Sequence, residues 1–205
     1  MLVDRHAAIA RPSLVDFKHD PNAEAEFKRL ATDGGILLMS HAGNWQAAIP
    51  TLALLGKPVH LVMATETNAA VAKTLRLGED SRVIDARQFI EAAPQIVSAL
   101  NAGEIVSFMG DRAYGAASAP VEFLGETAYF PVAAFRIAAA TGKPVYFLFV
   151  PRVGRGRYIV NIPATAAPTG REGVREGLMR YTVALENFSN AYPYQCFPFA
   201  DLWQG

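Results

Sequence analysis

Short apolar runs alternate with stretches of helical spacing through the first half of the chain. Continuous apolar runs of this length are typical of strands buried on both faces of a sheet. The runs are residues 36–39, 59–63, 82–84 and 105–109, and helical spacing fits residues 45–55, 68–77 and 89–101. This alternation predicts a single α/β domain over residues 1–205, with a mostly parallel central sheet and helices on both faces.

The pattern changes after residue 110. Residues 111–120 are rich in Gly, Ala and Ser and have no periodicity, so we expect a loop at the sheet edge. The elements expected after it are a strand at 121–124, a helix at 131–140, strands at 145–153 and 157–162 joined by a turn, and a helix at 171–190. The hairpin would make the sheet partly mixed. The aromatic residues of 192–203 should pack back on the body.

Composition removes several classes of function. The 205 residues are 51% hydrophobic and 19% charged, and 19 basic side chains balance 19 acidic ones, so no net field attracts nucleic acid. The single cysteine, Cys196, excludes an internal disulfide, and the histidines have no metal-ligand spacing, so neither metal nor cofactor is expected. No apolar run approaches the roughly 20 residues of a membrane-spanning helix.

His41 is the first candidate for chemistry, because it directly follows the first expected strand. Ligands bind at the carboxyl ends of strands in such sheets, and a histidine there can act as a general base. Gly43 and Asn44 would open the next helix, where free amides stabilise an oxyanion or phosphate. The alternative is a structural histidine in a capping turn. Ser–His hydrolysis is disfavoured, because no Gly-x-Ser-x-Gly elbow surrounds Ser40.

Asp111 and Arg112 end the fourth strand, and we expect them at the same edge of the sheet as His41. The planar guanidinium of Arg112 could bind a phosphate or carboxylate, while Asp111 could orient Arg112 or His41. The alternative is an exposed loop ion pair that contributes little.

The segment Ser40-His41-Ala42-Gly43-Asn44-Trp45-Gln46 resembles the His-x4-Asp/Glu motif of the glycerolipid acyltransferase superfamily. It is closest in form to the bacterial lipid A biosynthesis (lauroyl/myristoyl) acyltransferases, where the motif often reads His-x-Gly-Asn-Trp-Glu. Further blocks follow that branch in the same order, namely Gly110-Asp111-Arg112, Phe123-Leu124-Gly125, Phe130-Pro131 and Tyr192-Pro193-Tyr194-Gln195.

The resemblance implies transfer of a fatty acyl group from an acyl carrier protein or coenzyme A thioester to a hydroxyl of a glycolipid or related lipid acceptor. His41 would be the base, and Gly43, Asn44, Arg112 and Gly125 would bind substrate. It also implies a cytoplasmic protein with peripheral contact at the inner face of the cell membrane. Members of the branch usually begin with a hydrophobic anchor, and this chain begins where that segment would end.

Gln46 departs from the family motif, which has a carboxylate at this position. An amide can accept a hydrogen bond from the imidazole ring, but it cannot neutralise an imidazolium. Asp111 is the candidate for a substitute carboxylate. The alternative function is a lipid- or acyl-binding protein that keeps the fold and has lost turnover.

Gln46→Glu separates these two functions, because it restores the carboxylate of the motif. For an active acyltransferase we expect unchanged or lowered acyl transfer, measured as consumption of an acyl thioester in the presence of acceptor. A gain of activity from nothing would instead identify the wild-type chain as a binding protein.

Overall fold

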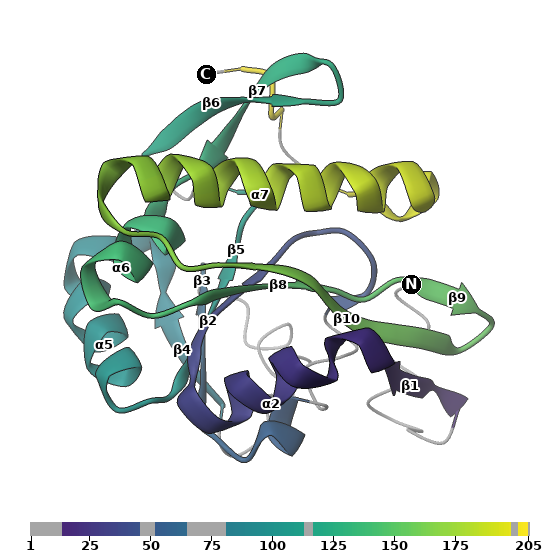
Figure 1. Cartoon of the computed structure of the whole chain (residues 1–205), viewed down its shortest axis with the longest axis horizontal. Helices are drawn as coiled ribbons and strands as arrows, with labels where there is room; N and C mark the ends of the chain where they lie inside the picture. The colour runs from purple at the N-terminus through teal and green to yellow at the C-terminus, as the bar shows by residue number, and fades with distance from the viewer. Residues whose placement is uncertain (1–13, 46–51, 65–80, 113–116, 198–200, 205) are drawn as a thin grey trace.

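The chain folds around one eight-stranded, mainly parallel sheet (Figure 1). A computed structural model describes residues 14–45, 52–64, 81–112, 117–197 and 201–204. The strands of the sheet are β1 (Asp16–His19), β2 (Gly35–Met39), β3 (Val59–Met63), β4 (Ser81–Asp85), β5 (Ile105–Met109), β8 (Val145–Phe149), β9 (Arg152–Gly154) and β10 (Arg157–Ala166). Their order is β1-β10-β8-β2-β5-β3-β4, and β9 pairs with β10.

The middle of the sheet is parallel and one side is mixed. Strands β8, β2, β5, β3 and β4 pair in parallel, whereas β10 is antiparallel to both β8 and β9. The register of β2 and β5 places Met39 beside Met109. The predicted single α/β domain architecture with a mostly parallel, partly mixed sheet is therefore confirmed.

Helices cover both faces of the sheet (Figure 1). The α-helices are α2 (Glu24–Asp33), α5 (Phe89–Asn101), α6 (Ala133–Thr141) and α7 (Gly170–Ala191), and short 3-10 turns are η2 (Pro21–Ala23), η3 (Ala53–Leu55), η4 (Ala86–Gln88) and η5 (Pro193–Gln195). Successive strand side chains point to opposite faces. Ile36 and Leu38 accordingly pack with residues of α5, α6 and α7, while Leu37 and Met39 pack with residues of α2.

A separate hairpin lies outside the main sheet, where the sequence predicted only one strand, at 121–124. Strands β6 (Ser118–Phe123) and β7 (Glu126–Pro131) pair antiparallel around a turn at Leu124 and Gly125. The expected loop at 111–120 therefore ends in a strand, and α6 begins after Pro131 rather than at it. Inward Val121, Phe123, Ala128 and Phe130 supply the burial that holds this small sheet on the body.

Other boundaries also differ from those expected. The strand predicted at 145–153 is interrupted at Val150 and Pro151, because proline has no N–H for the ladder. Strand β10 continues beyond 162 to Ala166, and helices α5 and α7 agree with the sequence pattern. Strand β1 and helix α2 were missed, because most of their side chains are polar and exposed. The helix expected at 68–77 lies outside the described residues, as does most of that at 45–55.

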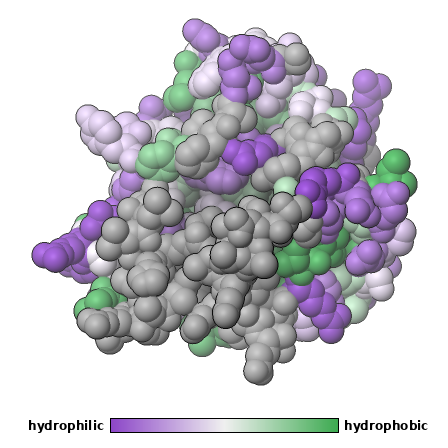
Figure 2. All heavy atoms as spheres, turned by 180° about the vertical axis from the view of Figure 1, so that it is seen from behind, coloured by the Kyte–Doolittle hydropathy of each residue, from purple (hydrophilic) through white to green (hydrophobic). Residues whose placement is uncertain are grey.

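The tail packs on the body only in part, because Leu202 is buried and Trp203 is 41% exposed, whereas Tyr194 is 92% exposed. The Tyr129 N–H donates to the Leu202 carbonyl at 2.7 Å, and this hydrogen bond joins the tail to β7. Outside the grey atoms, the face in Figure 2 shows hydrophobic residues in small groups among hydrophilic ones. Among the helices described, none is both long and apolar enough to cross a membrane.

Candidate functional site

His41 and Asp111 meet at the carboxyl edge of the sheet. Strands β2 and β5 are parallel neighbours that end in register at Met39 and Met109, so the residues that follow them leave the sheet side by side. The Gly110 N–H donates to the Met39 carbonyl at 2.7 Å, which links the two strand ends. Glycine is needed at this position because a Cβ would lie 2.6 Å from the ring of Tyr181.

The Asp111 carboxylate holds His41 through both its ring and its main chain. Nδ1 of His41 lies 3.1 Å from Oδ1 and 3.2 Å from Oδ2 of Asp111, and the His41 N–H donates to Oδ2 at 2.7 Å. Asp111 is only 3% exposed and the His41 side chain 15% exposed. A carboxylate facing Nδ1 favours the tautomer with the proton on Nδ1, which leaves a free lone pair on Nε2.

The turn after His41 is held by main-chain hydrogen bonds on two sides. The Gly43 N–H donates to the Gln195 carbonyl at 2.8 Å, and the Asn44 N–H donates to the Val150 carbonyl at 2.9 Å. The Phe197 N–H donates to the His41 carbonyl at 2.8 Å. Residues 41–44 therefore lie between the end of β8 and the segment that follows α7.

Gly43 is required by this arrangement. Its φ is +70°, and a Cβ would lie 2.3 Å from the Val150 carbonyl oxygen. The close approach that Gly43 makes is to the backbone of Val150, and binding of substrate by Gly43 stays a prediction.

Asn44 and Trp45 support the turn from inside the protein. The Asn44 side chain is 5% exposed and its Nδ2 donates to the Tyr158 hydroxyl at 3.2 Å. The Trp45 ring stands edge-on to the imidazole of His41 with centroids 6.2 Å apart. Binding of substrate by Asn44 stays a prediction.

A cavity of about 340 Å³ opens beside His41, and we call it the His41 cavity. His41 and Asp111 are among the residues that line it. Its apolar lining comes from the β6–β7 hairpin, α7 and the tail, and includes Phe123, Leu124, Leu185, Leu202 and Trp203. A polar pair thus faces an apolar space of the size that small-molecule sites usually have.

Cys196 also lines the His41 cavity. Burial raises the pKa of its thiol, an effect partly offset by its hydrogen bond to the Ser189 hydroxyl at 3.3 Å, and the nearby Asp111 charge raises the pKa further. The thiol therefore stays protonated at neutral pH and is a weak nucleophile.

Tyr181 packs under the ends of β2 and β5, which carry His41 and Asp111. It is fully buried on α7, and its hydroxyl donates to the Met39 carbonyl at 3.3 Å. Burial, together with the Asp111 charge, raises the pKa of this phenol well above its usual value, so it remains a neutral donor.

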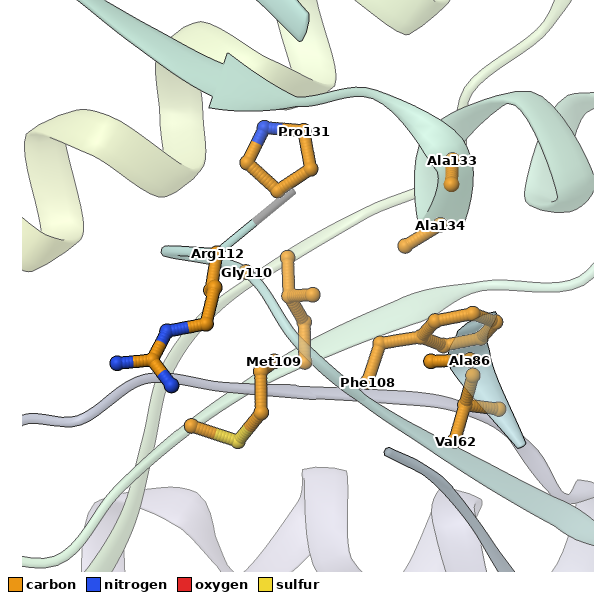
Figure 3. Close-up of a pocket in the computed structure, with 10 residues that line it drawn as sticks. Val62, Ala86, Phe108, Met109, Gly110, Arg112, Pro131, Ala133 and Ala134 are labelled. Atoms are coloured by element: carbon orange, nitrogen blue, oxygen red, sulfur yellow. The ribbon is translucent and has the colours of Figure 1, made fainter. Parts of the chain in front are cut away.

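Arg112 and Gly125 do not line the His41 cavity. Arg112 borders a smaller space of about 30 Å³ with Met109 and Pro131, and in Figure 3 its side chain runs away from Pro131. Gly125 lies exposed at the tip of the hairpin with φ +83°. Gln46 lies outside the described residues.

The sequence did not predict the residues that are distant from His41 in sequence and support the site in the folded chain. Val150, Tyr181, Cys196 and Phe197 belong to no motif quoted above, and Gln195 ends the Tyr192-Pro193-Tyr194-Gln195 block without any sign of its contact with the His41 turn. In the part of the chain that is described, no cluster of side chains could hold a metal ion.

A family model described as bacterial lipid A biosynthesis acyltransferase matches residues 12–203, nearly the whole chain. No curated protein matches the sequence.

Gly43→Ala should lower the free energy of unfolding by about 1–3 kcal/mol or more, because the methyl group adds a clash with Val150 to an unfavourable φ. Urea unfolding measures the change. Gly142→Ala is the matched control, since Gly142 has φ +67° but open space around its Cβ position. Equal losses in the two variants would contradict the close contact with Val150.

Proposed function

The chain belongs to the bacterial lipid A biosynthesis acyltransferase family, and we propose that it transfers a fatty acyl group from a thioester donor to a hydroxyl of a glycolipid or related lipid. The observation that carries the proposal is the hydrogen-bonded pair of His41 and Asp111 beside an apolar cavity. A base, its orienting carboxylate and a space for a hydrocarbon chain are the parts that this reaction needs.

The proposed reaction is a direct transfer. Nε2 of His41 takes the proton of the acceptor hydroxyl while the hydroxyl oxygen attacks the thioester carbonyl carbon. The tetrahedral intermediate then collapses, the C–S bond breaks, and the imidazolium returns the proton to the leaving thiolate. The products are the ester and a free thiol, and His41 is regenerated.

Asp111 takes the role that the family motif assigns to position 46. Its carboxylate faces Nδ1, so it fixes the tautomer and stabilises the imidazolium that forms during transfer. On this proposal Gln46 need not supply charge, and activity does not depend on restoring a carboxylate there.

The acyl chain of the donor is proposed to occupy the His41 cavity. Burial of a hydrocarbon chain against Phe123, Leu185 and Leu202 contributes about 0.8 kcal/mol for each methylene removed from water. Arg112, the residue after Asp111, is proposed to bind a phosphate or carboxylate of the donor or acceptor at the same edge of the sheet.

The neighbouring Cys196 is not proposed as an acyl carrier. Since burial keeps its thiol protonated, an acyl-cysteine intermediate has little support, and direct transfer by His41 is favoured.

We propose an acyl carrier protein or coenzyme A thioester as donor, with the reaction at the inner face of the cell membrane. The family match supports an acyl donor and a lipid acceptor in general. A cavity lined largely by apolar side chains also favours a second function, acyl binding without turnover.

His41→Ala should abolish acyl transfer, and Asp111→Asn should lower kcat by about three to four orders of magnitude, because the amide cannot stabilise an imidazolium. Transfer is followed as free thiol released from an acyl thioester in the presence of a lipid acceptor. Glu104→Gln is the matched control: Glu104 Oε2 lies 2.6 Å from Nε2 of His60, in a second histidine–carboxylate pair near the opposite edge of the sheet. Wild-type protein that binds acyl groups but releases no thiol would establish the binding function instead.

Leu185→Trp should shorten the preferred acyl chain, because the indole fills part of the His41 cavity. The expected loss in kcat/KM is roughly fourfold for each excluded methylene, from about 0.8 kcal/mol per methylene, with short-chain thioesters little affected. Val183→Trp is the control on the same helix, since Val183 is 58% exposed and does not line this cavity. An equal loss for all chain lengths would contradict the assignment of the cavity.

A further inference from the structure

We propose that Gln195 is a positioning residue for His41, which it holds through the main chain rather than by contact with substrate. The inference rests on the proposed function, because it assigns Gln195 a part in the reaction of His41. Gln195 lies in the short turn η5, after α7, and neither its side chain nor its main chain belongs to the catalytic pair.

The Gln195 side chain binds both polar groups of one residue in another element. Its Oε1 accepts the Arg152 N–H at 2.8 Å, and its Nε2 donates to the Arg152 carbonyl at 2.9 Å. Two hydrogen bonds of opposite direction fix both the position and the orientation of the amide. We call this pairing the Gln195 clamp.

The clamp joins the two supports of the His41 turn. Val150, which accepts from Asn44, stands two residues before Arg152, and the Gln195 carbonyl itself accepts from Gly43 at 2.8 Å. The next bridge pairs Cys196 with Ala42, and the Phe197 N–H donates to the His41 carbonyl at 2.8 Å. The two side-chain hydrogen bonds of the clamp therefore connect segment 195–197 to the start of β9, shortly after the end of β8.

Small displacements of His41 matter for its chemistry. A misplacement of about 1 Å in a catalytic group can lower the rate by roughly a hundredfold, even when the change is made elsewhere. The carboxylate of Asp111 fixes the ring and the N–H of His41, and the segment held by the clamp binds the His41 carbonyl on the other side of the residue. This predicts an effect on turnover larger than the effect on substrate binding.

The test uses Gln195→Ala and Gln195→Glu in the full chain. Alanine removes both hydrogen bonds of the clamp. Glutamate keeps the acceptor for the Arg152 N–H but has no donor for the Arg152 carbonyl, so it also breaks the clamp. If Gln195→Ala does not fold, Gln195→Glu is used for the test. Tyr194→Ala is the matched control, because Tyr194 is adjacent and 92% exposed.

In both Gln195 variants kcat should fall by about tenfold to a hundredfold with KM changed by less than about twofold. Cys196, the single thiol of the chain, should also react about tenfold faster with a thiol reagent, since segment 195–197 opens more often. Tyr194→Ala should match wild type in all of these values. Faster labelling with unchanged kcat would overturn the positioning role, and unchanged labelling would overturn the clamp.

One readout does not require turnover. The imidazole C–H resonance of His41, assigned by its loss in His41→Ala, should shift in the Gln195 variants and stay at its wild-type position in Tyr194→Ala. If no acyl transfer is found in wild type, this shift still supports the clamp while the proposed function fails. A resonance that does not move in either Gln195 variant would overturn the inference.

Discussion

The site depends on one carboxylate that binds one histidine at two points. Asp111 accepts from the His41 main chain at 2.7 Å and faces its ring at 3.1 Å, so backbone and side chain are fixed together. This is possible only because β2 and β5 are adjacent, parallel and in register to their last residues. The buried strands that give the sheet its stability therefore also set the geometry of the chemistry. A slip of one residue between them would separate the pair.

The apolar surroundings strengthen this arrangement. Asp111 is 3% exposed, so its charge is little screened by water, and its main partners are the two nitrogen atoms of His41. The phenol of Tyr181 and the thiol of Cys196 are both held neutral by burial, which leaves the carboxylate as the dominant charge beside the imidazole. The chain as a whole has no net charge, and the electrostatics of the site are accordingly local.

The sheet and the position of His41 could be predicted because both follow from patterns of neighbouring residues in the sequence. Buried parallel strands are continuous apolar runs, and the end of such a strand is where ligands bind. Asp111 was predicted at the same edge for the same reason. Strand β1 and helix α2 were not predicted: β1 has four mostly exposed residues, and α2 buries only Phe27 and Leu30 among polar side chains. The roles of Val150 and Gln195 were also hidden, because their partners are distant in sequence. The Val150 carbonyl accepts from Asn44, and the Gln195 side chain binds the main chain of Arg152, 43 residues earlier.

The hairpin of β6 and β7 contributes Phe123 and Leu124 to the cavity beside His41, yet it makes no strand pairing with the main sheet. The wall that is proposed to meet the hydrocarbon chain and the strands that align His41 and Asp111 are thus built by separate parts of the chain. Insertions or deletions at the hairpin turn could reshape the wall while β2 and β5 stay in register. Such a division lets substrate range diverge among relatives on a fixed chemical frame, and it makes the hairpin the natural segment to exchange in engineered enzymes.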